Sequence, residues 1–315
     1  MKNSAILVSL LILCLTIYLT NIKENLVPVF SLRSTLFEGS NYPSDILFHD
    51  DKIWLTELRG NRVSAYPLSA FSDPDLATPI TSSSKINSPH FLTSNGNLMF
   101  VSAGWGEDIY KKSAAVDSEF EVTDFSPLTL KAPHGLCIKD GWLYVADSLN
   151  SRLVRKKLES DLLTNIEPQI FSDTQSKISY VRQIRCDEAG VWLVNSYENR
   201  PGLNLGKGSN ILLVKNFMSG EVDIKYESLT SNATGMELIN GRYLIVGLWQ
   251  ANKIVMLDLK NRDNELLELE LPKPYAGPPY GMNYSAEDKK LYVAFIGDLY
   301  KEGNFGGVAT YDISF

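Results

Sequence analysis

The chain has 315 residues, a formal net charge of −7 and 44% hydrophobic residues. This composition provides enough apolar side chains for a sizeable core and is not that of a disordered protein. No cluster of lysine or arginine stands out, which argues against nucleic acid and against an anionic membrane surface as partners.

The N-terminal segment has the pattern of a secretory signal. Lys2 precedes the apolar run AILVSLLILCLTIYLT, residues 5–20, and a basic residue before such a run is typical of a signal peptide or a signal anchor. The run lacks an A-x-A-like cleavage site and is short for a membrane span. We therefore expect residues 1–25 to be either a cleaved signal or an uncleaved anchor. The rest of the chain would be secreted, periplasmic or held at a membrane through this segment alone.

Six similar segments follow, each with an apolar run, a polar turn and a second apolar run. They begin at Tyr42, Ser88, Pro133, Tyr180, Ala233 and Pro278. When the segments are aligned, the equivalent residues at the start of the first run, which we call the head positions, are Ser44, His90, His134, Arg182, Thr234 and Tyr280. A period in the forties with short β-rich runs indicates propeller blades of four antiparallel strands. Asn95-Gly96, Asp140-Gly141 and Asn240-Gly241 supply the residues that tight hairpins between the first two strands require.

The two ends of this region complement each other. The sixth segment supplies only three strands, the last in VATYDISF, residues 308–315, while residues 27–37 have no blade of their own. Pairing of these two stretches would remove an exposed sheet edge. The predicted fold is all-β: a six-bladed β-propeller whose ring is closed by an N-terminal strand. Residues 26–315 would form a single domain and act as a monomer.

The stretch PHGLCIKDGWLYVADSLNSRLVR, residues 133–155, resembles an NHL repeat. The chain as a whole resembles the six-bladed propellers of the NHL and SMP-30/gluconolactonase type. Such propellers include both enzymes and interaction scaffolds, so the fold does not determine the function.

Strand direction places a candidate site at one mouth of the central channel. The start of each first strand and the end of each second strand lie at the same face, because antiparallel strands alternate in direction. His90, His134, Arg182 and Tyr280 are therefore expected to open onto one mouth, where imidazole suits a metal or proton transfer and guanidinium suits an anion. Secondary candidates near this mouth are Asp45, Glu57, Asp147, Asn195, Glu237 and, as a stacking platform, Trp105.

The resemblance leaves two functions open. Lactonases of the SMP-30 type hold calcium with Glu, Asp and Asn, a set that the head positions here do not repeat. Amidating-lyase relatives hold zinc with three histidines, of which His90 and His134 would match two, so a zinc or calcium ion would need a further ligand. One hypothesis is a non-catalytic propeller that binds a small molecule or peptide at the channel mouth. The alternative is a metal-dependent hydrolase or lyase, of the lactonase, esterase or amidating-lyase type, which uses the His/Arg/Tyr arc.

Two further residues are expected to be structural. Cys137 and Cys186 lie three and four residues beyond their head positions, so they should point to opposite faces of their sheets. We therefore expect buried packing rather than a disulfide between them. His49, in a turn between first and second strands, should lie solvated on the opposite face of the ring.

Overall fold

The computed structural model describes residues 28–33, 42–71, 78–83, 86–113, 118–159, 162–163, 166–171, 173, 177–196, 209–229, 231–260, 267–272, 277–297 and 306–315. The expected signal segment, residues 1–25, lies outside them. Within the described part of the chain, none of the helices has the length and apolar character to cross a membrane.

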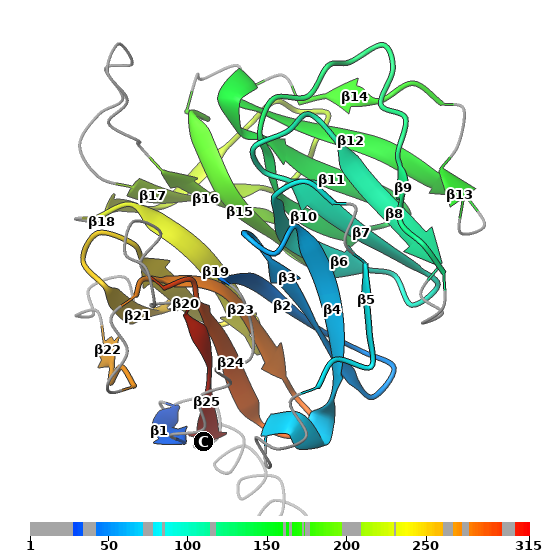
Figure 1. The fold of residues 1–315 in the computed structure, drawn as a ribbon. Helices are drawn as coiled ribbons and strands as arrows, with labels where there is room; N and C mark the ends of the chain where they lie inside the picture. The colour runs from blue at the N-terminus through cyan, green and yellow to red at the C-terminus, as the bar shows by residue number, and fades with distance from the viewer. Residues whose placement is uncertain are drawn as a thin grey trace, which may run out of the picture.

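Six antiparallel sheets follow one another along the chain and form the blades of a propeller (Figure 1). Blade 1 contains β2 (Pro43–His49), β3 (Lys52–Glu57), β4 (Arg62–Pro67) and β5 (Thr81–Ser83). Blade 2 contains β6 (Pro89–Ser94), β7 (Leu98–Ala103), β8 (Ile109–Ser113) and β9 (Glu121–Val122). Blade 3 contains β10 (Pro133–Lys139), β11 (Trp142–Asp147), β12 (Arg152–Glu159), β13 (Leu162–Leu163) and β14 (Gln169–Ile170). Blade 4 contains β15 (Tyr180–Asp187), β16 (Gly190–Ser196), β17 (Ser209–Val214) and β18 (Asp223–Leu229). Blade 5 contains β19 (Ala233–Ile239), β20 (Tyr243–Leu248), β21 (Lys253–Asp258) and β22 (Leu267–Leu269).

Blade 6 closes the ring with strands from both ends of the chain. It contains β23 (Pro279–Ser285), β24 (Lys290–Phe295), β25 (Gly307–Ser314) and, as its fourth strand, β1 (Val29–Arg33). β1 pairs antiparallel with β25, from Val29 opposite Ser314 to Arg33 opposite Thr310. The first strands of neighbouring blades also contact one another, and β2 contacts both β6 and β23. The predicted six blades and their N-terminal closing strand are thus confirmed.

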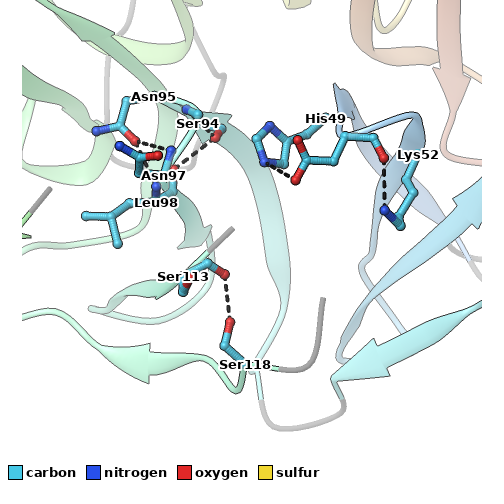
Figure 2. A network of polar contacts seen from close by, with 10 residues as sticks. His49, Lys52, Ser94, Asn95, Asn97, Leu98, Ser113 and Ser118 are labelled. Atoms are coloured by element: carbon cyan, nitrogen blue, oxygen red, sulfur yellow. Dashed lines mark hydrogen bonds and ion pairs between the residues drawn. The ribbon is translucent and has the colours of Figure 1, made fainter. Parts of the chain in front are cut away.

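The hairpin turns between the first two strands follow from their sequences. Asp140 and Gly141 have φ angles of 52° and 70°, and Asn240 and Gly241 have 53° and 62°, the left-handed pair that a two-residue hairpin turn needs. In blade 2, the Asn95 side-chain oxygen accepts the Leu98 N–H at 2.8 Å (Figure 2).

His49 is the last residue of β2, directly before the equivalent turn of blade 1, and is also drawn in Figure 2. Its Nε2 is 3.2 Å from the Asp50 carboxylate, and its side chain is only 10% exposed. The expected solvated surface position is therefore wrong, because the imidazole is largely buried.

The core consists of apolar layers between neighbouring blades, since the sheets stack face to face. One layer joins Tyr144 and Leu153 of blade 3 to Ile184 and Leu193 of blade 4. Such inter-blade layers hold the six first strands close together around the axis, and those strands carry the head positions.

The layer between blades 3 and 4 also contains a disulfide between Cys137 and Cys186, with the two Cα atoms 5.7 Å apart. The expectation of two separate cysteines is therefore wrong. The two residues do lie on opposite faces of their own sheets, but consecutive blades present opposite faces to each other. Cys137 on one face of blade 3 consequently meets Cys186 on the facing side of blade 4.

Candidate functional site

A β-bulge lies at the head position of every first strand. In blade 3, Pro133 is opposite Asp147, but Leu136 is opposite Val145, so the register shifts by one residue across His134. The other five first strands shift at the corresponding step. A bulge leaves a residue out of the regular ladder and re-aims its side chain. The six head side chains are therefore released from strict alternation at the end of the blades where the first strands begin.

Four of the six head side chains line one cavity of about 730 Å³: His90, His134, Arg182 and Tyr280. This volume falls in the range typical of small-molecule sites. Its lining also includes the charged residues Lys131 and Glu107. The sequence-predicted arc is thus brought together at one end of the ring.

His90 is a neutral, fixed imidazole. Its Nδ1 donates to the carbonyl oxygen of Ser88 at 2.9 Å, and its Nε2 accepts from the indole Nε1 of Trp105 at 3.1 Å. Burial, together with the nearby charge of Arg182, lowers the pKa of His90 to about 3. His90 therefore cannot contribute a positive charge to anion binding near neutral pH. Gly104 makes this position possible, because a side chain there would collide with the imidazole ring.

His134 is held in the same way by its own blade. Its Nδ1 donates to the carbonyl oxygen of Ala132 at 2.7 Å, and its side chain is buried, with 2% of the residue exposed. Its ring centroid lies 4.8 Å from that of His90 and 5.5 Å from that of Tyr180. His134 is therefore a packed residue as well as a cavity residue, and its removal will cost stability.

Arg182 and Tyr280 complete the cluster from the other side of the channel. The Arg182 guanidinium donates to the Tyr280 hydroxyl at 3.3 Å and lies 5.0 Å from the centroid of the Tyr180 ring. Tyr280 stacks on Phe91 at 5.6 Å and meets Trp249 edge-on at 5.5 Å. Aromatic contacts of this geometry fix the phenol, and the phenol in turn positions the guanidinium.

The remaining two head residues join blades instead of lining the cavity. The Ser44 hydroxyl donates to the carbonyl oxygen of Pro89 at 2.9 Å, and the Thr234 hydroxyl donates to that of Pro279 at 2.8 Å. In both cases the acceptor is the first residue of the next blade.

An apolar collar surrounds the cavity above the head side chains. Apolar residues one or two positions beyond the second strands of blades 1, 2, 3, 5 and 6 all line the cavity: Leu58, Trp105, Leu149, Trp249 and Ile296. The Trp105 side chain, which is 73% exposed, is the most accessible of them. Only Trp105 was among the sequence candidates, although an apolar residue just after the second strand recurs in five segments and was a usable signal.

Three of the secondary candidates serve their own blades and do not line the cavity. Each is fully buried at the end of a second strand and bonds to the start of the third strand. The pairs are Glu57 with Arg62 at 2.7 Å, Asp147 with Arg152 at 2.6 Å, and Asn195 with Asn210 at 2.9 Å. Asp147 and Asn195 also accept backbone N–H groups from the segment that leads into the first strand, at Lys131 and Ser179.

Asp45 and Glu237 lie deeper in the channel. Glu237 pairs with Arg185 at 3.2 Å, and burial raises its pKa. Asp45 is fully buried and accepts the Leu92 N–H at 2.9 Å, and burial raises its pKa to about 7. Its second oxygen has no partner among the described residues.

Asp45 belongs to a tier of residues that follow the head positions directly: Asp45, Phe91, Gly135, Gln183, Gly235 and Gly281. The three side chains are completely buried, and the Asp45 carboxylate occupies the space that a side chain at Gly281 would fill. These residues are not among those that line the cavity; they form the next level along the first strands, which we call the floor.

The donor set does not suit the expected zinc or calcium ion. Across the described ranges, histidine, cysteine and carboxylate side chains nowhere gather in a group of three that could hold a metal. Zinc needs at least three protein ligands and calcium more, and His90 Nε2 is bonded to Trp105. His90 and His134 therefore contact backbone carbonyls, Trp105 and each other, and this arrangement does not form a metal site.

No family model and no curated protein sequence matches the chain. Among solved structures, a gluconolactonase from Xanthomonas campestris aligns with a TM-score of 0.62 at 11% identity, over 90% of this chain and 90% of that one. A streptogramin B lyase aligns with a TM-score of 0.59 at 13% identity, over 90% and 98%. The chain shares their six-bladed β-propeller fold.

A third similar structure was determined with a small molecule, quinupristin. It is a catalytically inactive virginiamycin B lyase from Staphylococcus aureus. It aligns with a TM-score of 0.57 at 17% identity, over 91% of this chain and 89% of that one. Similarity at this level concerns the fold, so the function of the present chain must be argued from its own cavity.

Proposed function

We propose that this propeller binds an organic anion with an apolar or aromatic body in the cavity at the head positions. The arrangement that carries the proposal is the apolar collar above a single guanidinium, Arg182, which Tyr280 positions. The collar suits the body of a small molecule or peptide, and a guanidinium suits a carboxylate. Because His90 is neutral, the positive charge that attracts the anion must come from Arg182 and Lys131.

A matched pair of probes tests this proposal. N-acetyl-tyrosine and its amide differ only in the carboxylate, and binding beside Trp105 and Trp249 can be followed by tryptophan fluorescence. We expect the acid to bind about tenfold more tightly than the amide, the scale of one charge-assisted contact. Arg182→Met should remove that preference. Equal binding of acid and amide, or no binding of either at millimolar concentration, would contradict the proposal.

A second candidate function is cleavage of a lactone or ester, as a hydrolase or a lyase. It is favoured by a specific feature: the imidazole of His134, whose Nδ1 donates to the Ala132 carbonyl, lines the same cavity as Arg182 and Tyr280. A neutral imidazole can accept a proton as a general base, and a guanidinium can stabilise negative charge that develops on an oxygen. The gluconolactonase and streptogramin lyase folds make cyclic esters the first compounds to test.

Mass spectrometry separates the two reaction types. Hydrolysis of quinupristin or of gluconolactone adds one water to the product, whereas elimination opens a ring without a change in mass. We expect either reaction to be lost in His134→Gln, which keeps a hydrogen-bonding side chain but no imidazole. Compounds that remain intact after prolonged incubation would leave binding alone as the function.

We further propose that the propeller works outside the cytoplasm. The Cys137–Cys186 disulfide supports this location, since such bonds persist mainly in oxidising compartments, and Lys2 with its apolar run points the same way. A C-terminal fusion to a reporter that is active only in the cytoplasm should be inactive. Full reporter activity would contradict the location.

A further inference from the structure

A second cavity, of about 330 Å³, lies between blades 4 and 5. Its lining includes Ala189 and Gly241, which belong to the turns between the first and second strands of these blades. These turns are at the opposite end of the blades from the head positions, so this cavity is separate from the candidate site described above.

The walls of this cavity are apolar. Trp192 and Ile211 face it from blade 4, and Leu244 and Leu257 face it from blade 5. All four are buried residues of one inter-blade core layer. Protein interiors are close-packed with few voids larger than a water molecule, so a space of this size between two packed sheets is large enough to take the apolar part of a ligand.

The rim carries an excess of positive charge. Lys215 and Lys225 both pair with one carboxylate, that of Asp223, at 2.7 and 3.1 Å. Asp258, also on the rim, is paired with Arg242 at 2.7 Å, and Lys260 adds a further ammonium group. The described lining residues thus include three lysines and one carboxylate, that of Asp258, so they carry a net positive charge in a protein whose net charge is −7.

We propose that the cleft between blades 4 and 5 binds an amphipathic organic anion, a molecule with an apolar chain and a carboxylate or sulfonate head. The chain would lie among Trp192, Ile211 and Leu244, and the head would lie beside Lys215 and Lys260. This proposal is independent of the function proposed for the first cavity, because the two cavities share no residue.

Decanoate and decanol, below their aggregation concentrations, are the probes, and the reporter is Trp192, whose indole N–H donates to Asp187 at 2.9 Å. The experiment uses the Trp105→Phe/Trp249→Phe protein, so that no tryptophan of the first cavity contributes. Decanoate should change the fluorescence saturably and bind about tenfold more tightly than decanol, the scale of a charge-assisted contact.

Three variants complete the test, each with an unfolding midpoint to show that it is folded. Lys260→Glu should weaken decanoate about fivefold or more, whereas Lys139→Glu, the same charge change on blade 3, should leave it unchanged. Ala189→Phe places a large side chain at an exposed turn of the opening and should abolish binding without entering the core. Equal affinity for decanoate and decanol, no effect of Ala189→Phe in a folded protein, or no saturable binding would overturn the proposal.

Discussion

Blades 1 and 5 use their head positions differently from blades 2, 3, 4 and 6, although all six residues occupy the same bulge. Ser44 and Thr234 are short, and their hydroxyls donate to the first carbonyl of the next blade. His90, His134, Arg182 and Tyr280 are long enough to reach the cavity. The same backbone feature therefore serves blade-to-blade attachment or ligand contact, depending on the side chain, so stability and binding can be altered separately.

The largest expected effect concerns blades 3 and 4, which both carry long head residues and are joined by the disulfide. Replacement of both Cys137 and Cys186 by alanine should lower the free energy of unfolding by on the order of 4 kcal/mol, the chain-entropy value for their sequence separation of 49. Urea unfolding measures this loss, and the wild type with a reductant should behave like the variant. An unchanged midpoint would mean that packing alone joins these blades.

The next effect tests the attachment role of the short head residues. The double variant Ser44→Ala/Thr234→Val leaves two buried carbonyls with one donor fewer each, at about 1 kcal/mol apiece. We expect a loss of about 2 kcal/mol in unfolding free energy and unchanged affinity for the acid probe, N-acetyl-tyrosine. Arg182→Met should instead weaken binding of the acid probe and change the unfolding free energy little. If both variants changed stability and affinity alike, the distinction between the two classes of head residue would fail.

Asp45, in the floor, should make the free energy of unfolding depend on pH. Burial raises its pKa from 3.8 to about 7, so the folded state binds a proton that the unfolded state releases. Its contribution is complete below pH 3.8 and is lost as pH rises to about 7. Asp45→Asn should therefore stabilise the protein more at pH 8 than at pH 5, by on the order of 2 kcal/mol. The charges that act on Asp45 are those of Arg185, which lowers its pKa, and Glu237, which raises it.

The smallest expected effect comes from His90, which should make the protein less stable as pH falls, whereas Asp45 makes it less stable as pH rises. The pKa of His90 falls from 6.5 to about 3 on burial, so its contribution is present above pH 6.5 and is lost as pH falls. His90→Gln should remove about 1 kcal/mol of acid destabilisation between pH 6.5 and 5.5. The two slopes partly offset each other in the wild type, so the comparison needs thermal or urea midpoints of both single variants. Parallel pH curves for His90→Gln and wild type would contradict the neutral imidazole.

The repeats and the head positions were predictable because they depend on local patterns. An apolar run, a turn with Gly and a second run recur within one blade, and Pro133 or Pro279 marks the step before the head residue. The closing strand could be predicted from the missing fourth strand of blade 6. These inferences need only the hydrogen-bond pattern of an antiparallel sheet.

Contacts between blades and in the links were less predictable. The Cys137–Cys186 bond depends on which face of one sheet meets which face of the next, and the period alone does not supply this. Glu57 and Asp147 were predicted near the channel mouth, but each instead forms an ion pair within its own blade. Their partners, Arg62 and Arg152, follow them five residues later in the sequence. The cavity between blades 4 and 5 depends on side-chain packing, which leaves no periodic signal.

The floor beneath the head positions has a kinetic consequence. Phe91, Asp45 and Gln183 are completely buried there, and the Gln183 side chain also accepts the Met236 N–H at 2.6 Å. We expect these packed side chains to close the channel, so that a bound molecule leaves by the opening through which the next one arrives. Exchange is then sequential, and the residence time of one occupant limits the arrival of its successor. Trp105, the exposed residue at that opening, is the side chain whose replacement should change association and dissociation rates together.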